Sequence, residues 1–300
     1  MTVIPPFLSP QDSVAIVSPA KAIDNSLLLN AKKYWESKGF NVLLGKNSAG
    51  EDNYFSGSKL QRAEDLQWAL DHENVKAVIC ARGGYGCVHL IDLINWSAML
   101  NTPKWLVGFS DVTVFHHQLA KLGLASVHGT MPLNYAENSE IAKQSVVDCL
   151  SGKNLNYSWK TEVSKPGRAE GELLGGNLAV LTHLIGTSVF SDYKDKILFL
   201  EEVGEYLYAI DRMFFQLEKS GVLDQISGVI LGGFSSMKDT SPGFGEELNN
   251  LILSYFKYRN IPVAFNFPGG HIDDNRALPF GVNATFTVDG TEATLSIKKA

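Results

Sequence analysis

The chain is short of cysteine and of long apolar runs. Its 300 residues include three cysteines, Cys80, Cys87 and Cys149, and no two of them form a C-x-x-C pair. An odd number without paired spacing argues against a disulfide framework and favours a reducing compartment. No stretch approaches the roughly 18 apolar residues of a membrane-spanning helix. The first ten residues lack the basic stretch and apolar core of a signal peptide. We therefore predict a cytoplasmic protein that does not bind membranes.

Positive charge is also scarce. Lysine and arginine number 26 against 32 aspartates and glutamates, which gives a formal net charge of −6. This balance argues against a nucleic-acid partner, but it allows a small anionic substrate that meets positive groups locally. No cluster of His, Cys, Asp and Glu has the usual metal-ligand spacing, although His271 with Asp273 and Asp274 leaves a metal possible. We predict no metal and no cofactor.

The order of apolar segments indicates an α/β protein. Apolar runs end near residues 17, 44, 80 and 107, and segments with helical spacing separate them. This alternation predicts a parallel-sheet, Rossmann-like N-terminal domain over residues 1–152. Residues 153–167 are polar and are expected to form an irregular linker. A mixed α/β domain follows over 168–300, closed by an antiparallel hairpin around Asp289-Gly290.

Two loops at strand ends could carry chemistry. Arg82-Gly83-Gly84-Tyr85-Gly86 follows one predicted strand, and Gly108-Phe109-Ser110-Asp111 follows the next. Because ligands bind at the carboxyl ends of such strands, both loops are expected on one rim. Ser110 lies at a turn from strand to helix, where a nucleophile is placed, but the turn lacks the second glycine of G-x-S-x-G. Taken alone, the turn favours Ser110 as a helix cap over Ser110 as a nucleophile. The glycine-rich loop is neither a P-loop nor a dinucleotide fingerprint.

A serine nucleophile needs a base and an acid that orients the base. His271 follows Pro268-Gly269-Gly270 in a loop and could present its imidazole, or it could be an ordinary surface histidine. Glu201 and Glu202 end a buried run, so one of them should point toward the rim, either to orient His271 or to pair with Arg212 or a lysine.

Three further histidines are less informative. Of the adjacent His116 and His117, one is expected to face solvent, and His128 could line the crevice because it follows a strand end.

Five motifs in a fixed order resemble the LD-carboxypeptidase family of serine peptidases, which also includes the microcin-immunity peptidases. They span nearly the whole chain. The motifs are Arg82-Gly-Gly-Tyr-Gly86, Gly108-Phe-Ser-Asp111, Glu170-Gly-Glu-Leu-Leu-Gly-Gly-Asn177, Leu200-Glu-Glu-Val-Gly-Glu205 with Asp211-Arg212, and Gly270-His271.

The resemblance implies a catalytic triad shared by two domains. Ser110 would be the nucleophile, His271 the base and Glu201 the orienting acid, with the backbone N–H groups of Gly84 and Asp111 as the oxyanion hole. The position of Glu202 is often aspartate in relatives, and this departure weakens the choice of Glu201.

The resemblance also implies a substrate. It is a murein tetrapeptide that loses its terminal D-alanine during cell-wall recycling, with a homodimer as the assembly. Because a carboxypeptidase must recognise a free carboxylate, Arg82, with Tyr85 on the same loop, and the helix N-terminal amides near Ser110 are candidate substrate-binding groups, although Arg82 could equally form a structural ion pair. One alternative is a microcin-type peptidase that cleaves a peptidyl or aminoacyl nucleotide. No aromatic-rich insertion separates Ser110 from Glu201, which favours the cell-wall substrate. Another alternative, outside enzymes, is a two-lobed protein that binds a small ligand.

Overall fold

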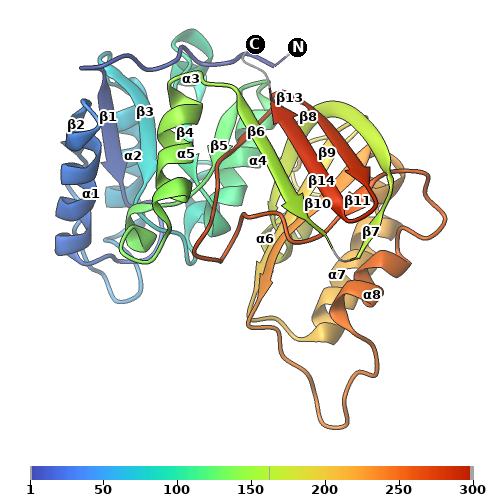
Figure 1. Ribbon diagram of the computed structural model, residues 1–300. Helices are drawn as coiled ribbons and strands as arrows, with labels where there is room; N and C mark the ends of the chain where they lie inside the picture. Colours follow the sequence, from blue (N-terminus) through green and yellow to red (C-terminus); the bar gives the residue numbers. More distant parts are fainter. Residues whose placement is uncertain (1, 162, 298–300) are drawn as a thin grey trace.

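The structure, a computed structural model, describes residues 2–161 and 163–297. It has two lobes that lie side by side, each built on one β-sheet (Figure 1). The chain runs through the first lobe, crosses to the second near residue 155, and ends in the second lobe.

The sheet of the first lobe has the strand order β12-β5-β4-β3-β1-β2. Neighbouring strands among β1 to β5 pair in parallel, and β12 is antiparallel to β5. Its strands are β1 (Ser13–Val17), β2 (Asn41–Leu44), β3 (Val75–Cys80), β4 (Trp105–Gly108), β5 (Ser126–His128) and β12 (Leu278–Phe280). The helical segments of this lobe are α1 (Asn25–Ser37), α2 (Lys59–Asp71), η1 (Cys87–Leu90), α3 (Ser97–Asn101), η2 (Ser110–Val112), α4 (Thr113–Lys121), η3 (Pro132–Asn134) and α5 (Glu140–Leu150).

Local sequence signals explain where these helices begin. The Asp24 side chain accepts from the Ser26 N–H at the start of α1, and Ser58 forms a capping box with Gln61 at the start of α2. The central strands read as apolar runs because both of their faces are covered, and every residue of β4 is buried. From the other edge the strand order is β2-β1-β3-β4-β5. The chain therefore leaves β1 toward β2 on one side, while β3 and the later strands lie on the other side.

The sheet of the second lobe is mixed, with the order β6-β14-β13-β8-β9-β10-β11-β7. Strands β8 to β11 pair in parallel, while β13, β14, β6 and β7 join as antiparallel neighbours. Its strands are β6 (Leu155–Lys160), β7 (Ser164–Lys165), β8 (Gly167–Asn177), β9 (Ile197–Val203), β10 (Gly228–Ser235), β11 (Val263–Ala264), β13 (Asn283–Asp289) and β14 (Glu292–Ile297). Its helical segments are α6 (Leu178–Leu184), α7 (Leu207–Lys219), η4 (Val222–Asp224) and α8 (Leu248–Ser254).

The expected fold class is confirmed, including the hairpin of β13 and β14. The expected irregular linker is wrong, because residues 153–167 contain β6, which pairs along its whole length with β14, and β7. Alternate residues of β6 are buried, so its polar side chains are those of a half-exposed strand. The limits of the two domains stay a prediction, and β12 shows that a late segment completes the first sheet.

The end of β8 joins the two lobes next to the start of α4. The Asn177 N–H donates to Thr113 Oγ1 at 3.0 Å. A Cβ atom on Gly176 would collide with Thr113 Oγ1, so this approach requires glycine. None of the helices in the described ranges is long and apolar enough to cross a bilayer.

Candidate active site

Ser110 occupies a strained turn between β4 and α4. Its φ is +63°, in a region that costs a non-glycine residue on the order of 1–3 kcal/mol. The glycine-rich loop after β3 lies directly against this turn. A Cβ atom on Gly83 would come within 3.2 Å of both Ser110 Oγ and the Asp111 nitrogen. The loops after β3 and β4 therefore share one rim, and Gly83 lets them touch.

His271 is bonded to Glu201 across the second lobe. Its Nδ1–H donates to Glu201 Oε2 at 2.6 Å, and its backbone N–H donates to the same oxygen at 3.2 Å. Glu201 lies in β9 and is fully buried. Gly270 allows the contact, because a Cβ there would lie 2.6 Å from Glu201 Cβ and its φ is +103°. This arrangement fixes the tautomer and leaves Nε2 as the available ring nitrogen.

The ring of Phe109 connects the His271–Glu201 pair with the serine turn. The His271 ring lies 4.9 Å from the Phe109 ring, measured between centroids, and Phe109 directly precedes Ser110. His271, paired with Glu201, therefore lies beside the residue that precedes Ser110, and side chains of both lobes meet at the serine turn. A serine, an imidazole and a buried carboxylate in this arrangement can perform nucleophilic catalysis.

Burial and charge act in opposite directions on the pKa of His271. Burial disfavours the imidazolium, but the charge and hydrogen bond of Glu201 and the charge of Glu202 outweigh it. The net effect raises the pKa above its ordinary value of 6.5. The buried carboxylate of Glu201 thus favours the protonated form of His271, the form that a general base reaches when it takes a proton.

Glu202 points the other way and has a different set of partners. Its carboxylate accepts hydrogen bonds from Asn177 Nδ2 at 3.0 Å, from the Ala179 N–H at 2.7 Å and from the Val203 N–H at 2.8 Å. It therefore caps α6 and ties it to β9. Both glutamates are buried, and the expected pairing of one of them with Arg212 or a lysine is absent from the ion pairs of the described residues.

Asp111 fastens the two rim loops together. Its Oδ2 accepts from the Cys87 N–H at 2.8 Å, at the start of η1. Burial raises the pKa of Asp111, although its hydrogen bonds with Cys87 oppose this effect. The carboxylate thus holds the glycine-rich loop, in which Gly84 has a φ of +106°, beside the serine turn.

Comparison with known proteins identifies the family. The chain matches the family model of the LD-carboxypeptidase N-terminal domain over residues 14–129 and that of the LD-carboxypeptidase C-terminal domain over residues 170–286. The murein tetrapeptide carboxypeptidase of Pseudomonas aeruginosa is 31% identical, across 90% of this chain and 92% of that protein. The chain belongs to the LD-carboxypeptidase family.

Two more similarities agree with this assignment. The crystal structure of muramoyltetrapeptide carboxypeptidase from Oxalobacter formigenes is 30% identical, with a TM-score of 0.88 and coverage of 95% of this chain and 98% of that one. The microcin C7 self-immunity protein MccF of Escherichia coli is 24% identical, across 94% of this chain and 93% of that protein. This LD-carboxypeptidase family member is therefore an enzyme, a carboxypeptidase, which rules out the non-catalytic binding protein.

Arg82 and Tyr85 lie on either side of the glycine-rich loop of this carboxypeptidase. Arg82 Nη1 donates to the Ala22 carbonyl at 2.8 Å, and no ion pair of the described residues includes Arg82. Tyr85 is half exposed and its ring packs on His89. It borders a pocket of about 510 Å³ that Asp111 also lines. The other lining residues are Val88, Ile91, Asp92, Val114, Ala179, Val180, His183, Leu184, Thr187, Ser188 and Val189.

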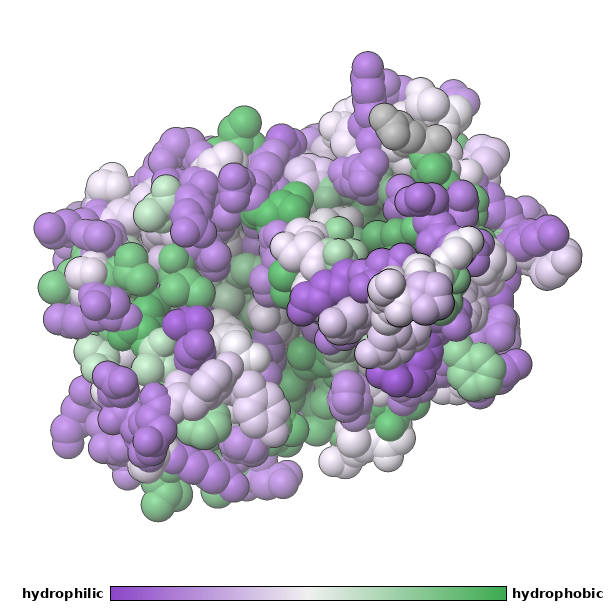
Figure 2. Space-filling view, turned by 90° about the horizontal axis from the view of Figure 1, so that it is seen from below, coloured by the Kyte–Doolittle hydropathy of each residue, from purple (hydrophilic) through white to green (hydrophobic). Residues whose placement is uncertain are grey.

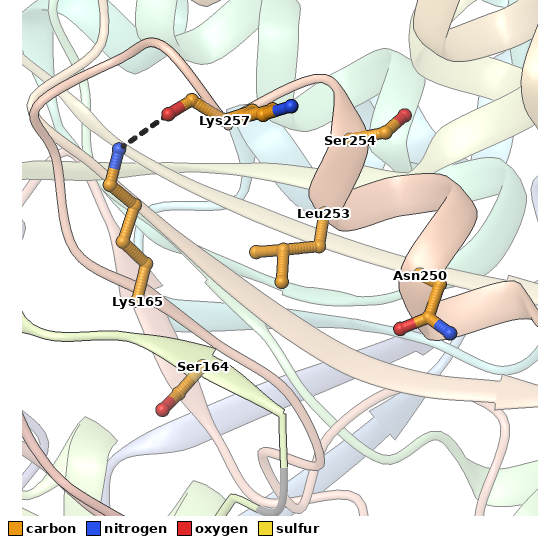
Figure 3. Close-up of a pocket in the computed structure, with 6 residues that line it drawn as sticks. All are labelled: Ser164, Lys165, Asn250, Leu253, Ser254 and Lys257. Carbon is orange, nitrogen blue, oxygen red and sulfur yellow. Dashed lines mark hydrogen bonds between the residues drawn. The ribbon is translucent and has the colours of Figure 1, made fainter.

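This pocket lies where the two lobes meet, since its walls come from η1 and α4 on one side and from α6 on the other. Viewed from the carboxyl ends of β1 and β3, hydrophobic side chains gather in the recess between the lobes (Figure 2). A second pocket, of about 300 Å³, lies away from the site between β7 and α8, where Lys165 turns toward the Lys257 carbonyl (Figure 3). Ser110, Glu201 and His271 line neither of these two pockets.

The remaining histidines correct the sequence-based expectations. His116 and His117 are both fully buried, so neither faces solvent. The His117 ring hydrogen-bonds to the hydroxyl of Tyr193, which comes from the other lobe and covers the outer face of α4. Burial lowers the pKa of His116 to about 4, and its Nε2 contacts the Gly108 carbonyl at 2.9 Å.

His128 is buried as well and does not line the crevice, because it packs under Phe109. Within the described ranges, no group of three or more His, Cys, Asp and Glu side chains is placed to hold a metal ion.

Sequence reasoning missed the residues that support the site. Thr113 and Asn177 join the lobes, and Glu202 caps α6. The Gly175-Gly176-Asn177 run was the available signal, since adjacent glycines in a strand mark close backbone approach.

Proposed function

We propose that this carboxypeptidase is a serine-type LD-carboxypeptidase that removes the terminal D-alanine from murein tetrapeptides in cell-wall recycling. The observation that carries the proposal is the bonded pair of His271 and buried Glu201 next to the strained Ser110 turn. The names of the relatives from Pseudomonas aeruginosa and Oxalobacter formigenes supply the substrate class.

The proposed mechanism is acyl transfer in two steps. Ser110 Oγ attacks the carbonyl carbon before the terminal residue while His271 Nε2 takes the hydroxyl proton. The same nitrogen then gives that proton to the leaving amine as the C–N bond breaks. A water molecule, deprotonated by His271, next attacks the acyl-enzyme and frees Ser110.

Two backbone donors complete the proposed site. The N–H groups of Gly84 and Asp111 flank the serine turn and would stabilise the oxyanion, an interaction worth roughly 2.7–4 kcal/mol for one donor. A Cβ atom on Gly83 would lie 3.2 Å from the Asp111 nitrogen, and this close approach of the two loops supports the placement. Glu201 stabilises the imidazolium that forms during the reaction. Arg82 and Tyr85, on the same loop, are proposed to contact the substrate.

Hydrolysis of defined substrates by the pure protein tests the proposal. A murein tetrapeptide ending in D-alanine should release D-alanine, detected by mass spectrometry, and Ser110→Ala should abolish the release. The same peptide ending in L-alanine is the matched control for stereochemistry. Cleavage of an aminoacyl nucleotide but not of the tetrapeptide would favour the microcin-type alternative, which the similarity to MccF motivates. Full activity of Ser110→Ala would overturn the nucleophile assignment.

The assembly and the compartment are proposals of the same kind. A homodimer follows from the family resemblance, and a cytoplasmic location from the cysteine content. Light scattering on the purified protein and fractionation of the producing cells test them.

A further inference from the structure

Two cations follow the carboxyl ends of β1 and β3 in the first sheet. Lys21 comes four residues after the last residue of β1, Val17, and Arg82 comes two after Cys80, which ends β3. These strands pair side by side (Figure 1), and the chain connections diverge between them. In open α/β sheets this point of divergence is where ligands bind.

Lys21 lies against the glycine-rich loop, which begins with Arg82. A Cβ atom on Gly84 would come within 3.0 Å of Lys21 Cβ and 2.9 Å of the Tyr54 hydroxyl. The ammonium of Lys21 lies 4.9 Å from the centroid of the Tyr54 ring. A Cβ atom on the preceding glycine, Gly83, would come within 3.0 Å of Ser110 Cβ. The stem of Lys21 is therefore separated from the nucleophile turn by two adjacent glycines.

Arg82 fixes the segment that carries Lys21. Its Nη1 donates to the carbonyl of Ala22, the residue after Lys21, at 2.8 Å. Its Nε is buried and has no hydrogen-bond partner within the described ranges. Burial lowers the pKa of Arg82, since the guanidinium is partly removed from water. A partly desolvated cation of this kind gains most from an anion.

Neither of these two cations has an acidic partner among the ion pairs of the described residues. In a chain with more acidic than basic residues, neither Lys21 nor Arg82 takes part in an ion pair of the described residues. The neighbouring Arg62 differs from these two cations in the number of its acceptors. Its guanidinium donates to three carbonyl oxygens, those of Gly57, Pro19 and Gly86. Asp52, on the nearby loop, is exposed and accepts from Asn53 Nδ2.

We propose that Lys21, together with Arg82, binds the free terminal carboxylate of the peptide substrate, with Lys21 as the direct cationic contact. The inference rests on the proposed function and deepens it, because it explains why the enzyme would act only at a chain end. An amide or an extended peptide would bring no negative charge to this position. Lys21 is then a specificity-determining residue, and its effect is confined to substrates that carry the terminal carboxylate.

The test compares two substrates that differ only at this group: the tetrapeptide ending in D-alanine and the same peptide ending in D-alanine amide. Wild-type enzyme should prefer the free acid. Lys21→Met, which keeps the apolar stem, should reduce the ratio of kcat/KM for acid over amide by about 10- to 100-fold, as expected for loss of a charge-assisted hydrogen bond. Lys21→Arg should restore most of the ratio.

Lys33→Met is the matched control, because Lys33 is exposed on α1 of the same lobe, and its ratio should equal that of wild type. A Lys21→Met ratio within twofold of wild type, or an equal loss on both substrates, would overturn the inference while leaving the proposed function intact. Failure of wild-type enzyme to cleave either peptide would overturn both.

Discussion

Glu201 and Glu202 are adjacent and both buried, and their substitutions are predicted to have opposite effects on turnover and stability. Because successive residues of a strand point to opposite faces, Glu201 reaches His271 while Glu202 reaches the start of α6. Replacing each by glutamine removes the charge with almost no change in volume. We expect Glu201→Gln to lose turnover and keep stability, and Glu202→Gln to lose stability and keep turnover.

The size of each effect follows from the contacts. Glutamine at position 201 can still accept from His271 Nδ1, and Glu201 Oε1 has no hydrogen-bond partner in the described ranges, so no further bond is broken. Glutamine no longer stabilises the imidazolium, and its amide N–H can donate to Nδ1 and select the wrong tautomer. An acid-to-amide exchange of this kind in a serine triad costs on the order of 10⁴ in kcat. Glutamine at position 202 has one acceptor oxygen where the carboxylate serves three donors. At least one buried or partly buried donor is left unpaired, which costs about 1–3 kcal/mol when the donor is fully buried.

Both quantities can be measured on the same preparations. Thermal unfolding should show that Glu202→Gln lowers Tm by several degrees. A loss of ~1 kcal/mol in the free energy of unfolding corresponds to roughly 2–4 °C in a protein of about this size. Steady-state kinetics on the tetrapeptide should show the loss of kcat in Glu201→Gln. The reasoning is refuted if Glu202→Gln loses turnover at unchanged Tm while Glu201→Gln remains active.

Three further predictions concern the base, the nucleophile and the histidine loop. Because His271, the proposed base, must be neutral to accept a proton and its pKa is raised, kcat/KM should rise with pH along a limb above pH 6.5. Glu201→Gln should move the residual limb to lower pH, and a limb that stays in place would contradict this. Ser110→Gly should abolish hydrolysis. In urea unfolding it should be more stable than Ser110→Ala by about 1 kcal/mol, because glycine tolerates the φ of +63°. Equal stabilities of the two variants would show that the turn is unstrained. Gly270→Ala should lower both kcat and Tm, since its Cβ would lie 2.6 Å from Glu201 Cβ; wild-type kcat in this variant would disprove the requirement for glycine.

Much of the fold could be predicted because its signals are local. The apolar runs that became β1, β3 and β4, the capping residues Asp24 and Ser58, and the hairpin at Asp289-Gly290 each depend on a few neighbouring positions. The strand β6 was missed because its alternating polar residues resemble a loop until β14 pairs with it.

The sequence alone determined which residues could do chemistry: a serine at a strand-to-helix turn, a histidine after two glycines and two adjacent glutamates at a strand end. It could not choose between Glu201 and Glu202, nor foresee that His116 and His117 are both buried. The first outcome depends on which face of β9 each glutamate side chain points to, and the second on residues of the second lobe that pack against α4. Only the tertiary structure decided them, because hydrogen-bond partners that are distant in sequence are assigned by packing, which no local pattern encodes.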